Sequence, residues 1–356
     1  YFNGKFWLYT THDEDTSITN GNIPFINDFD MRDWRAYSSL DMKTWTDHGV
    51  IMNFDDISWS SKHAWAVDVV YKNGLYYLYF PVEHQYIGVA TSLNPAGPFV
   101  DAIGKPLVSR DMPNAPYLSI DPGVLIDDDG QAYMFLGNDD PAAYINYGGL
   151  PFFARKTPRV VKLNEDMISL AGPIVDVEGV NDFFEAAWPH KHNGKYYLSY
   201  ASNGIYSDLS YAVADHPMGP YSKKGVFFDR AGLFDNSQPP SITNHHSIID
   251  VCDKSYLFYH TTELSGGLNY RRSVAADRLY YNNGDILPVQ KTTMGLGDSI
   301  YINIGETKGK YSYTDHNNKK WMRDSRRQNS LGISEHIYST HKPIKISKEP
   351  DVRAVL

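Results

Sequence analysis

The feature that most constrains the fold of this chain is a short hairpin signal that recurs along it. An Asn-Gly or Asp-Gly turn, followed by aromatic and aliphatic residues in near-continuous succession, begins at Asn3, Asn73, Asp129 and Asn193, with a degenerate copy at Asp253. Such turns favour tight β-hairpins, because both central residues must adopt positive φ. Counted from Gly4 to Gly74, Gly130, Gly194 and Asp253, the intervals are 70, 56, 64 and 59 residues, which suit a unit of four strands.

A second strand-like segment follows each hairpin in the same phase. These segments are residues 36–41, 88–92, 159–163, 210–214 and 272–276. Five units, none of which can bury its own faces, predict an all-β chain folded as a five-bladed β-propeller over residues 1-295. The alternative is a β-sandwich with coincidentally similar hairpins. Residues 296-356 are predicted to form a short C-terminal extension, which either closes the propeller or belongs to a truncated accessory domain.

Composition narrows the class of partner. The formal net charge is -9, whereas a nucleic-acid backbone or an anionic membrane would favour a basic patch, so we expect neither partner. The sequence contains no run of about 18 apolar residues, so it predicts no membrane span. The 27 tyrosines and 7 tryptophans suit β-strands and also suit sugars, whose C–H faces stack on aromatic rings. The lone Cys252 excludes an intrachain disulfide and is predicted to be a buried small hydrophobe.

The inner strands of the second to fifth predicted blades each carry a polar residue in an apolar stretch. These residues are Asp68, Asp121, Glu185 and His245. Burial of a charged group without a partner costs several kcal/mol, so such residues are candidates for a functional site. Asp121 and Glu185 each lie nine residues before the glycine of their hairpin, which predicts equivalent depths on adjacent blades. Asp68 has a different offset, and a structural role is an equal alternative for it.

Several of these segments resemble motifs of glycoside hydrolase family 43, whose members are five-bladed propellers. The similar segments are residues 11–15, 64–70, 119–130 and 184–191. The resemblance covers roughly residues 1–290 and implies that Glu185 is the general acid and that Asp121 tunes its pKa and orients it. It also implies that His245 lies on the channel axis near a possible structural calcium ion, with His246 as the alternative if the register differs by one. No cofactor is expected to be required.

The general base of the family is an aspartate on the inner strand of the first blade. Applying the nine-residue offset to Gly4 places it about five residues upstream of Tyr1, so it is absent from the chain. We expect a longer parent protein. The alternative is a catalytically inactive carbohydrate-binding propeller.

Four further residues are predicted to bind the substrate: Trp65, Phe184, Arg271 and His12. Core packing is the alternative for Trp65 and Phe184. Strand alternation sends only one of Arg271 and Arg272 inward, and Arg271 is the predicted one.

Together these features predict an inverting, exo-acting glycoside hydrolase that releases β-xylosyl or α-L-arabinofuranosyl residues from xylan or arabinan polysaccharides or oligosaccharides. Inversion needs a carboxylic acid and a carboxylate about 6.5–9.5 Å apart. Besides the inactive propeller, a related glycosidase acting on galactan is an alternative. The expected partner is a carbohydrate, and a secreted or periplasmic location is inferred from that substrate. The sequence makes no prediction of the oligomeric state.

Overall fold

The described part of the chain is almost entirely β-structure. The computed structural model describes residues 1–14, 29–138, 156–204, 207–229, 243–262, 264–265, 267–289, 291 and 296, and the backbone of 301–303, 312–314 and 320–323. One short 3-10 helix, η1 (Phe54–Asp56), interrupts the strands of these residues. None of the described helices is long and apolar enough to span a membrane.

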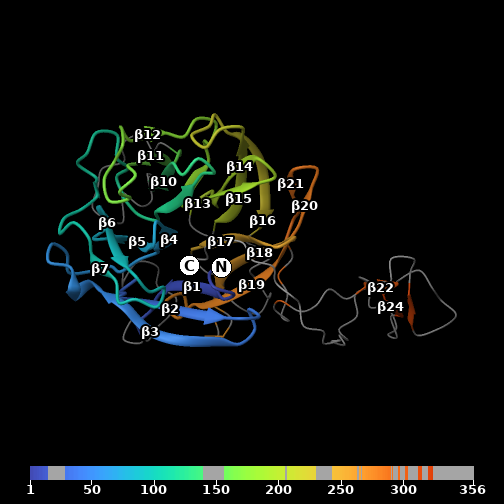
Figure 1. Cartoon of the computed structure of the whole chain (residues 1–356). Helices are drawn as coiled ribbons and strands as arrows, with labels where there is room; N and C mark the ends of the chain where they lie inside the picture. Colours follow the sequence, from blue (N-terminus) through green and yellow to red (C-terminus); the bar gives the residue numbers. More distant parts are fainter. Residues whose placement is uncertain are drawn as a thin grey trace. The chain divides into compact units, whose positions relative to one another are not determined.

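Five antiparallel sheets surround a central axis, and each is a blade of a propeller (Figure 1). Blade 1 contains β1 (Phe6–Thr11), β2 (Asp33–Ser39) and β3 (Trp45–Asn53). Blade 2 contains β4 (Asp68–Lys72), β5 (Leu75–Val82), β6 (Tyr86–Ser92), β7 (Val100–Asp101) and β8 (Val108–Ser109). Blade 3 contains β9 (Gly123–Ile126), β10 (Ala132–Leu136), β11 (Arg159–Leu163) and β12 (Val175–Asp176). The predicted five-bladed architecture is therefore confirmed.

The last two blades and the remaining strands complete the described structure. Blade 4 contains β13 (Phe183–His192), β14 (Lys195–Ser202), β15 (Asp208–Ala214) and β16 (Ser222–Phe228). Blade 5 contains β17 (His246–Val251), β18 (Lys254–Thr261) and β19 (Ser273–Leu279), and the hairpin β20 (Tyr281–Asn282) and β21 (Asp285–Ile286) follows it.

The chain divides into two compact units, of which the first contains Tyr1–Thr293 and the second is Met294–Ser347. In the second unit β22 (Tyr301–Asn303), β24 (Lys320–Arg323) and β23 (Ser312–Thr314) form a small sheet in that order. The role predicted for residues 296-356 stays a prediction, and residues 324–356 lie outside the described part of the chain.

The recurring turns take the backbone conformation that the sequence predicts. Both central residues are left-handed in the first, second and fourth turns, as at Asn73 (φ 52) and Gly74 (φ 87). In the degenerate fifth turn Cys252 takes this conformation (φ 51) and is exposed. The prediction that Cys252 is buried is therefore wrong, because a turn residue at the end of a hairpin faces solvent.

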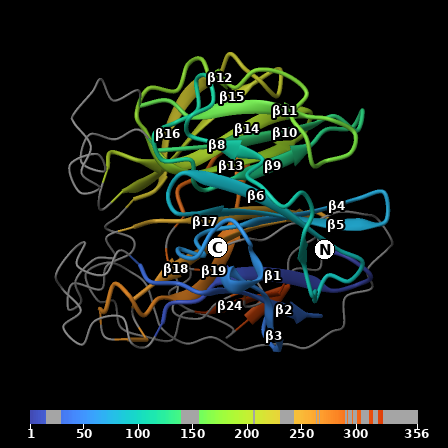
Figure 2. The same ribbon diagram turned by 90° about the vertical axis from the view of Figure 1, so that its left-hand side faces the viewer.

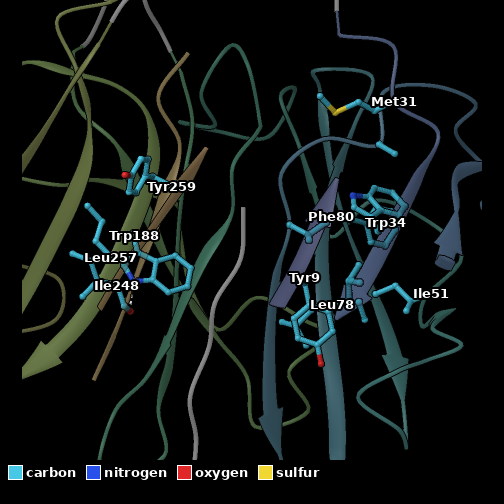
Figure 3. Packing of buried hydrophobic residues seen from close by; sticks show 14 of the residues in the cluster. Tyr9, Met31, Trp34, Ile51, Leu78, Phe80, Trp188, Ile248, Leu257 and Tyr259 are labelled. Atoms are coloured by element: carbon cyan, nitrogen blue, oxygen red, sulfur yellow. Dashed lines mark hydrogen bonds between the residues drawn. The ribbon is translucent and has the colours of Figure 1, made fainter. Parts of the chain in front are cut away.

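Apolar side chains fill the spaces between neighbouring blades. Figure 3 shows the largest cluster, with Trp34 and Phe80 packed together in one group and Trp188, Ile248 and Tyr259 in another. The rings of Trp34 and Phe80 are both fully buried, with centroids 5.1 Å apart. Burying one large side chain contributes about 1.5–3 kcal/mol, so these interfaces hold the sheets at fixed positions around the axis.

Blade 1 differs from the other four at its inner edge. In the other blades an inner strand precedes the recurring turn, whereas β1 follows it. Phe2 and Lys5 pair across the turn, with N–H···O distances of 2.8 and 3.0 Å, so residues 1–2 lie on the inner side of β1. The N-terminus lies at the end of the molecule where β4 and β5 turn (Figure 2). Beside it a cavity of about 530 Å³ is lined by Trp7 and Tyr9 and by residues of the four inner strands.

Candidate active site

The inner strands bring their polar residues to one mouth of the central channel. Asp68 begins β4, Asp121 comes just before β9, Glu185 lies near the start of β13, and His245 comes just before β17. Because each inner strand runs from this mouth toward its hairpin, the starts of the strands surround one opening. The sequence-predicted carboxylates and imidazole are therefore neighbours in space.

Asp121 is a buried carboxylate that joins three elements. Its side chain is 6% exposed, its Oδ2 accepts a hydrogen bond of 3.0 Å from the backbone N–H of Ala186, and Nδ1 of His245 lies 3.9 Å away. Burial raises the pKa of the Asp121 carboxyl, although His245, the Ala186 N–H and Arg272 act in the opposite direction. Burial disfavours the charged form of His245 too, so it lowers the pKa of this histidine and favours the neutral imidazole. Asp121 is thus placed to orient its neighbours but has little surface with which to touch a substrate.

Glu185 stands where the strand β13 is irregular. The β13–β14 pairing shifts register on both sides of Glu185, and Ala186 has a left-handed backbone (φ 59). A bulge of this kind re-aims a side chain relative to the regular alternation of the strand. Glu185 is half-buried, and its Oε2 accepts a hydrogen bond of 3.1 Å from Nδ2 of Asn138. Glu185 is therefore the more exposed of the two predicted catalytic carboxylates.

The arginine that enters the site is Arg272, whereas Arg271 is exposed. The Arg272 guanidinium binds Asp13 through Nη2–Oδ1 (2.7 Å) and Nε–Oδ2 (3.0 Å), and it lies 4.7 Å from the ring centroid of Phe29. Its charge also acts on Asp121 and His245. Arg272 is therefore the more enclosed of the two arginines, and the predicted substrate contact of Arg271 stays a prediction.

Among the contacts of the described residues, His12 lies beside two acidic residues, neither of which is Asp13. Its Nδ1 lies 3.4 Å from Oδ2 of Asp33 and 3.8 Å from Oε1 of Glu14. The ligand atoms of these three residues lie within 4.8 Å of one another, so they are close enough to share a metal ion. Arg35 already binds the other oxygen of Asp33 at 3.0 Å, however, and lowers the negative charge available to a cation. The predicted sugar contact of His12 stays a prediction.

The two predicted aromatic contacts have different surroundings. Trp65 is half-buried, packs beside Leu118 and Ile120 on the segment that leads to Asp121, and donates its Nε1–H to the carbonyl of Phe29 at 2.9 Å. Phe184 is 6% exposed and packs against Ala186 and Ala201. Trp65 therefore packs on the segment that leads to Asp121, whereas Phe184 packs in the core beside Glu185, and the predicted substrate contacts of both residues stay predictions.

Asp68 and His246 have structural partners. Asp68 is fully buried and its Oδ2 accepts the backbone N–H of Val124 at 2.6 Å, which ties blade 2 to blade 3. His246 is also fully buried, with Nε2 2.7 Å from Oγ of Ser199. Burial lowers the pKa of His246 well below its ordinary value, so this imidazole stays neutral. His245, not His246, is the histidine beside Asp121.

A calcium ion at the axis is the metal that the family resemblance implies. Calcium takes 6–8 oxygen ligands. Among the described residues, the surroundings of His245 offer its imidazole and the Asp121 carboxylate, whose Oδ2 already accepts from Ala186, and the positive Arg272 is close by. This donor set does not fit a calcium ion held by the protein's own oxygens.

Polar residues at the ends of the second strands also reach this mouth. Asp13, His84 and Asn138 each follow β1, β5 or β10 within two residues. Antiparallel pairing places the end of a second strand at the same mouth as the start of its inner strand. Among these three residues, Asn138 contacts an inner-strand carboxylate, that of Glu185. Sequence reasoning predicts His12 at such a position but misses His84 and Asn138, which are likewise polar residues that closely follow an apolar strand.

Comparisons with known proteins agree with this geometry. Residues 23–286 match the family model described as glycosyl hydrolases family 43. A xylosidase/arabinosidase of Humicola insolens is 35% identical over 330 residues, which cover 82% of this chain and 94% of that protein. A family 43 β-xylosidase/α-arabinofuranosidase from a compost microbial metagenome, solved with xylotriose in a calcium-free form, is 34% identical, with a TM-score of 0.67 over 81% of this chain and 92% of that one.

A second solved structure is similar to the same extent. It is an α-L-arabinofuranosidase of Clostridium thermocellum, 35% identical, with a TM-score of 0.66 over 84% of this chain and 94% of that one. The propeller, the inner-strand carboxylates and these matches have one explanation: the chain belongs to glycosyl hydrolases family 43.

Proposed function

We propose that this glycosidase is an inverting, exo-acting enzyme in which Glu185 is the general acid and Asp121 orients it. The observation that carries the proposal is the contrast between the two carboxylates at one mouth of the channel. Glu185 is half-buried and projects from a bulge, while Asp121 is buried and accepts the N–H of the residue that follows Glu185. A proton donor must reach the leaving group, whereas an orienting residue need only reach the donor.

Glu185 must give a proton to the glycosidic oxygen as the bond to the anomeric carbon breaks. In its ionised form Asp121 would hold that proton on Glu185 by like-charge repulsion until the leaving group takes it. The guanidinium of Arg272, held by Asp13, and the imidazole of His245 line the same mouth and are suited to bind sugar hydroxyls. These contacts would position the sugar whose anomeric carbon reacts.

The general base is proposed to come from a segment that precedes Tyr1 in the full protein. Three observations support this origin: the equal nine-residue offset of Asp121 and Glu185 from their hairpins, the Phe2–Lys5 pairing on the inner side of β1, and the cavity of about 530 Å³ along that edge. An inner strand in this position would complete blade 1. It would also bring an aspartate to the mouth where Asp121 and Glu185 lie.

The proposed substrates carry terminal β-xylosyl or α-L-arabinofuranosyl groups. The relatives are named for these two activities, and one was solved with xylotriose. The two pentoses present similar hydroxyl patterns, so one pocket can accept either. Xylan and arabinan are extracellular polymers, and a secreted or periplasmic location is proposed on that ground.

The test is hydrolysis of aryl β-xylosides and aryl α-L-arabinofuranosides by residues 1–356 and by a form extended upstream. We expect activity in the extended form and a large loss of activity without the extension.

In the active form, Glu185→Ala should lower kcat by about 10²–10⁴-fold on substrates with poor leaving groups and spare activated aryl leaving groups, which need little protonation.

Equal loss on both kinds of leaving group would contradict the acid role of Glu185. Sugar binding without turnover in either form would favour a carbohydrate-binding propeller instead.

A further inference from the structure

Asn138 is a buried amide that bridges blade 3 and blade 4 at the proposed acid. It follows β10 by two residues, is 2% exposed, and donates from Nδ2 to Oε2 of Glu185 at 3.1 Å. A carboxylate oxygen accepts and cannot donate, so the amide nitrogen, not the amide oxygen, faces it. The contact joins two blades at the residue that the proposed reaction depends on.

The backbone fixes the position of Asn138. Its N–H donates to the carbonyl of Leu118 and its carbonyl accepts from the N–H of Leu118, both at 3.1 Å. The preceding Gly137 donates to the carbonyl of Ile120 at 2.9 Å, at a φ of 120 that suits glycine. A Cβ on Gly137 would also lie 2.8 Å from the ring of Pro116. Asn138 and the residue before it are therefore hydrogen-bonded to the segment that leads to Asp121.

Blade 3 consequently contacts two successive residues of blade 4, one through a hydrogen-bond acceptor and the other through a donor. Asp121 accepts the N–H of Ala186, and Asn138 donates to the side chain of Glu185. These two contacts fall where the β13–β14 register shifts and where Ala186 is left-handed. Regular pairing with β14 does not fix the direction of the Glu185 side chain at this point, so the contacts from blade 3 take over that task.

We propose that Asn138 is a positioning residue that selects which oxygen of Glu185 delivers the proton. A protonated carboxyl has one hydroxyl oxygen and one carbonyl oxygen. A donor at Oε2 makes Oε2 the carbonyl oxygen and assigns the proton to Oε1. The same donor stabilises the carboxylate that remains after the proton has left. This inference rests on the proposed acid role of Glu185 and extends it to the neighbouring blade.

Two variants test the proposal in the form of the protein that turns over aryl glycosides. Asn138→Ala removes the donor, and Asn138→Asp keeps the shape but places a second carboxyl beside Glu185. We expect kcat/KM on substrates with poor leaving groups to fall about tenfold or more in each, with a smaller loss on activated aryl leaving groups. The high-pH limb of the profile, which reports deprotonation of the acid, should move upward in Asn138→Ala and further upward in Asn138→Asp.

A matched control and a second readout separate positioning from folding. Asn114 also donates from Nδ2 to a carboxylate, Asp176 on the outer strand β12, at 3.0 Å, and Asn114→Gly suits its left-handed backbone (φ 61). This control should leave both the leaving-group dependence and the pH limb unchanged. Carbon-13 NMR titration of the Glu185 carboxyl, assigned with Glu185→Gln, needs no turnover and should show a higher midpoint in both Asn138 variants.

The outcomes distinguish this inference from the proposed function. If Glu185→Ala loses activity equally on all leaving groups, the acid role itself is wrong. If Glu185→Ala behaves as an acid variant while the Asn138 variants keep the parent midpoint and lose activity equally on all leaving groups, the positioning role of Asn138 is overturned.

Discussion

At the scale of residues, the site depends on backbone conformations that most side chains avoid. Asp121 (φ 54) and Ala186 (φ 59) are both left-handed, and a hydrogen bond of 3.0 Å joins them. Such conformations cost about 1–3 kcal/mol each and persist only where the surrounding structure enforces them. Here they aim one carboxylate at the backbone of the next blade and the other at the open mouth of the channel.

The charge of Asp121 gives a prediction about pH. Asp121→Asn keeps an acceptor for the Ala186 N–H and tolerates the left-handed backbone, but it removes a negative charge beside Glu185. The proton on Glu185 should then be lost more readily, and the high-pH limb of the kcat/KM profile should move to lower pH, with activity reduced about 100-fold. Asp68→Asn, at the buried carboxylate of blade 2, is the control and should leave the limb in place. An unchanged limb in Asp121→Asn would argue against coupling between Asp121 and Glu185.

At the scale of elements, the inner strands β9 and β13 approach unusually closely. A Cβ on Gly123, the first residue of β9, would lie 2.2 Å from the carbonyl oxygen of Ala187 and 2.8 Å from Cδ of Pro189. Both obstacles belong to the backbone or ring of β13 and cannot rotate away. The glycine therefore sets the distance between the strand that follows Asp121 and the strand that carries Glu185.

Substitution of Gly123 should separate these strands. Gly123→Ala is expected to lower the free energy of unfolding by about 1–3 kcal/mol, because overpacking forces the backbone to shift. It should also lower kcat, since the shift moves Glu185 relative to Asp121. Chemical denaturation and aryl glycoside kinetics measure the two effects. The control is Gly172→Ala, where a Cβ has nothing within 4 Å, and equal stability of the two variants would refute the close approach.

At the scale of the whole propeller, an ion pair links the first blade to the last. Asp13 follows β1 in blade 1, and Arg272 immediately precedes β19 in blade 5. Arg272 donates to Asp13 from its guanidinium and also from its backbone N–H, at 2.8 Å. The side chains are 15% and 10% exposed, for Arg272 and Asp13 respectively, so solvent screens this pair weakly. The pair closes the ring of blades at the mouth that contains the proposed active site.

The stability that the Asp13–Arg272 ion pair contributes should depend on pH. Burial acts to raise the pKa of Asp13, but the charge and hydrogen bonds of Arg272 lower it below the ordinary 3.8. A carboxyl whose pKa is lower in the folded state stabilises the protein at any pH above its pKa in the unfolded state. That stability is lost as the pH falls through its pKa in the folded state. Asp13→Asn should therefore cost about 3 kcal/mol of unfolding free energy at neutral pH. The difference from the parent should shrink in acid below 3.8.

Denaturant titrations of both proteins from neutral pH into acid measure this difference. Lys195→Ala, which breaks the exposed Lys195–Asp215 pair, is the control and should change stability little, because solvent screens exposed ion pairs. A constant difference between Asp13→Asn and the parent at every pH would contradict the role of the Asp13 charge.

The sequence by itself determined the repeat and its consequences. Turn chemistry at Asn73-Gly74 and its copies fixed where each hairpin lies, and a unit that cannot bury both of its faces must pack against others, so five blades follow. Equal offsets from the turns placed Asp121 and Glu185 at one mouth, because the rise per residue is nearly constant along a strand. These features depend on turn conformation and on the pattern of apolar residues, and the local sequence determines both.

Only the tertiary structure decided which side chains face the site. Alternation cannot choose between Arg271 and Arg272 where the strand has yet to begin, and the bond to Asp13, 259 residues away, makes the choice. Alternation also cannot predict the direction of the Glu185 side chain, which lies at a bulge. There the contacts from Asn138 and Asp121 of blade 3 set that direction. The physical reason is the same in each case: where the ladder is irregular, contacts between blades outweigh the local two-residue period.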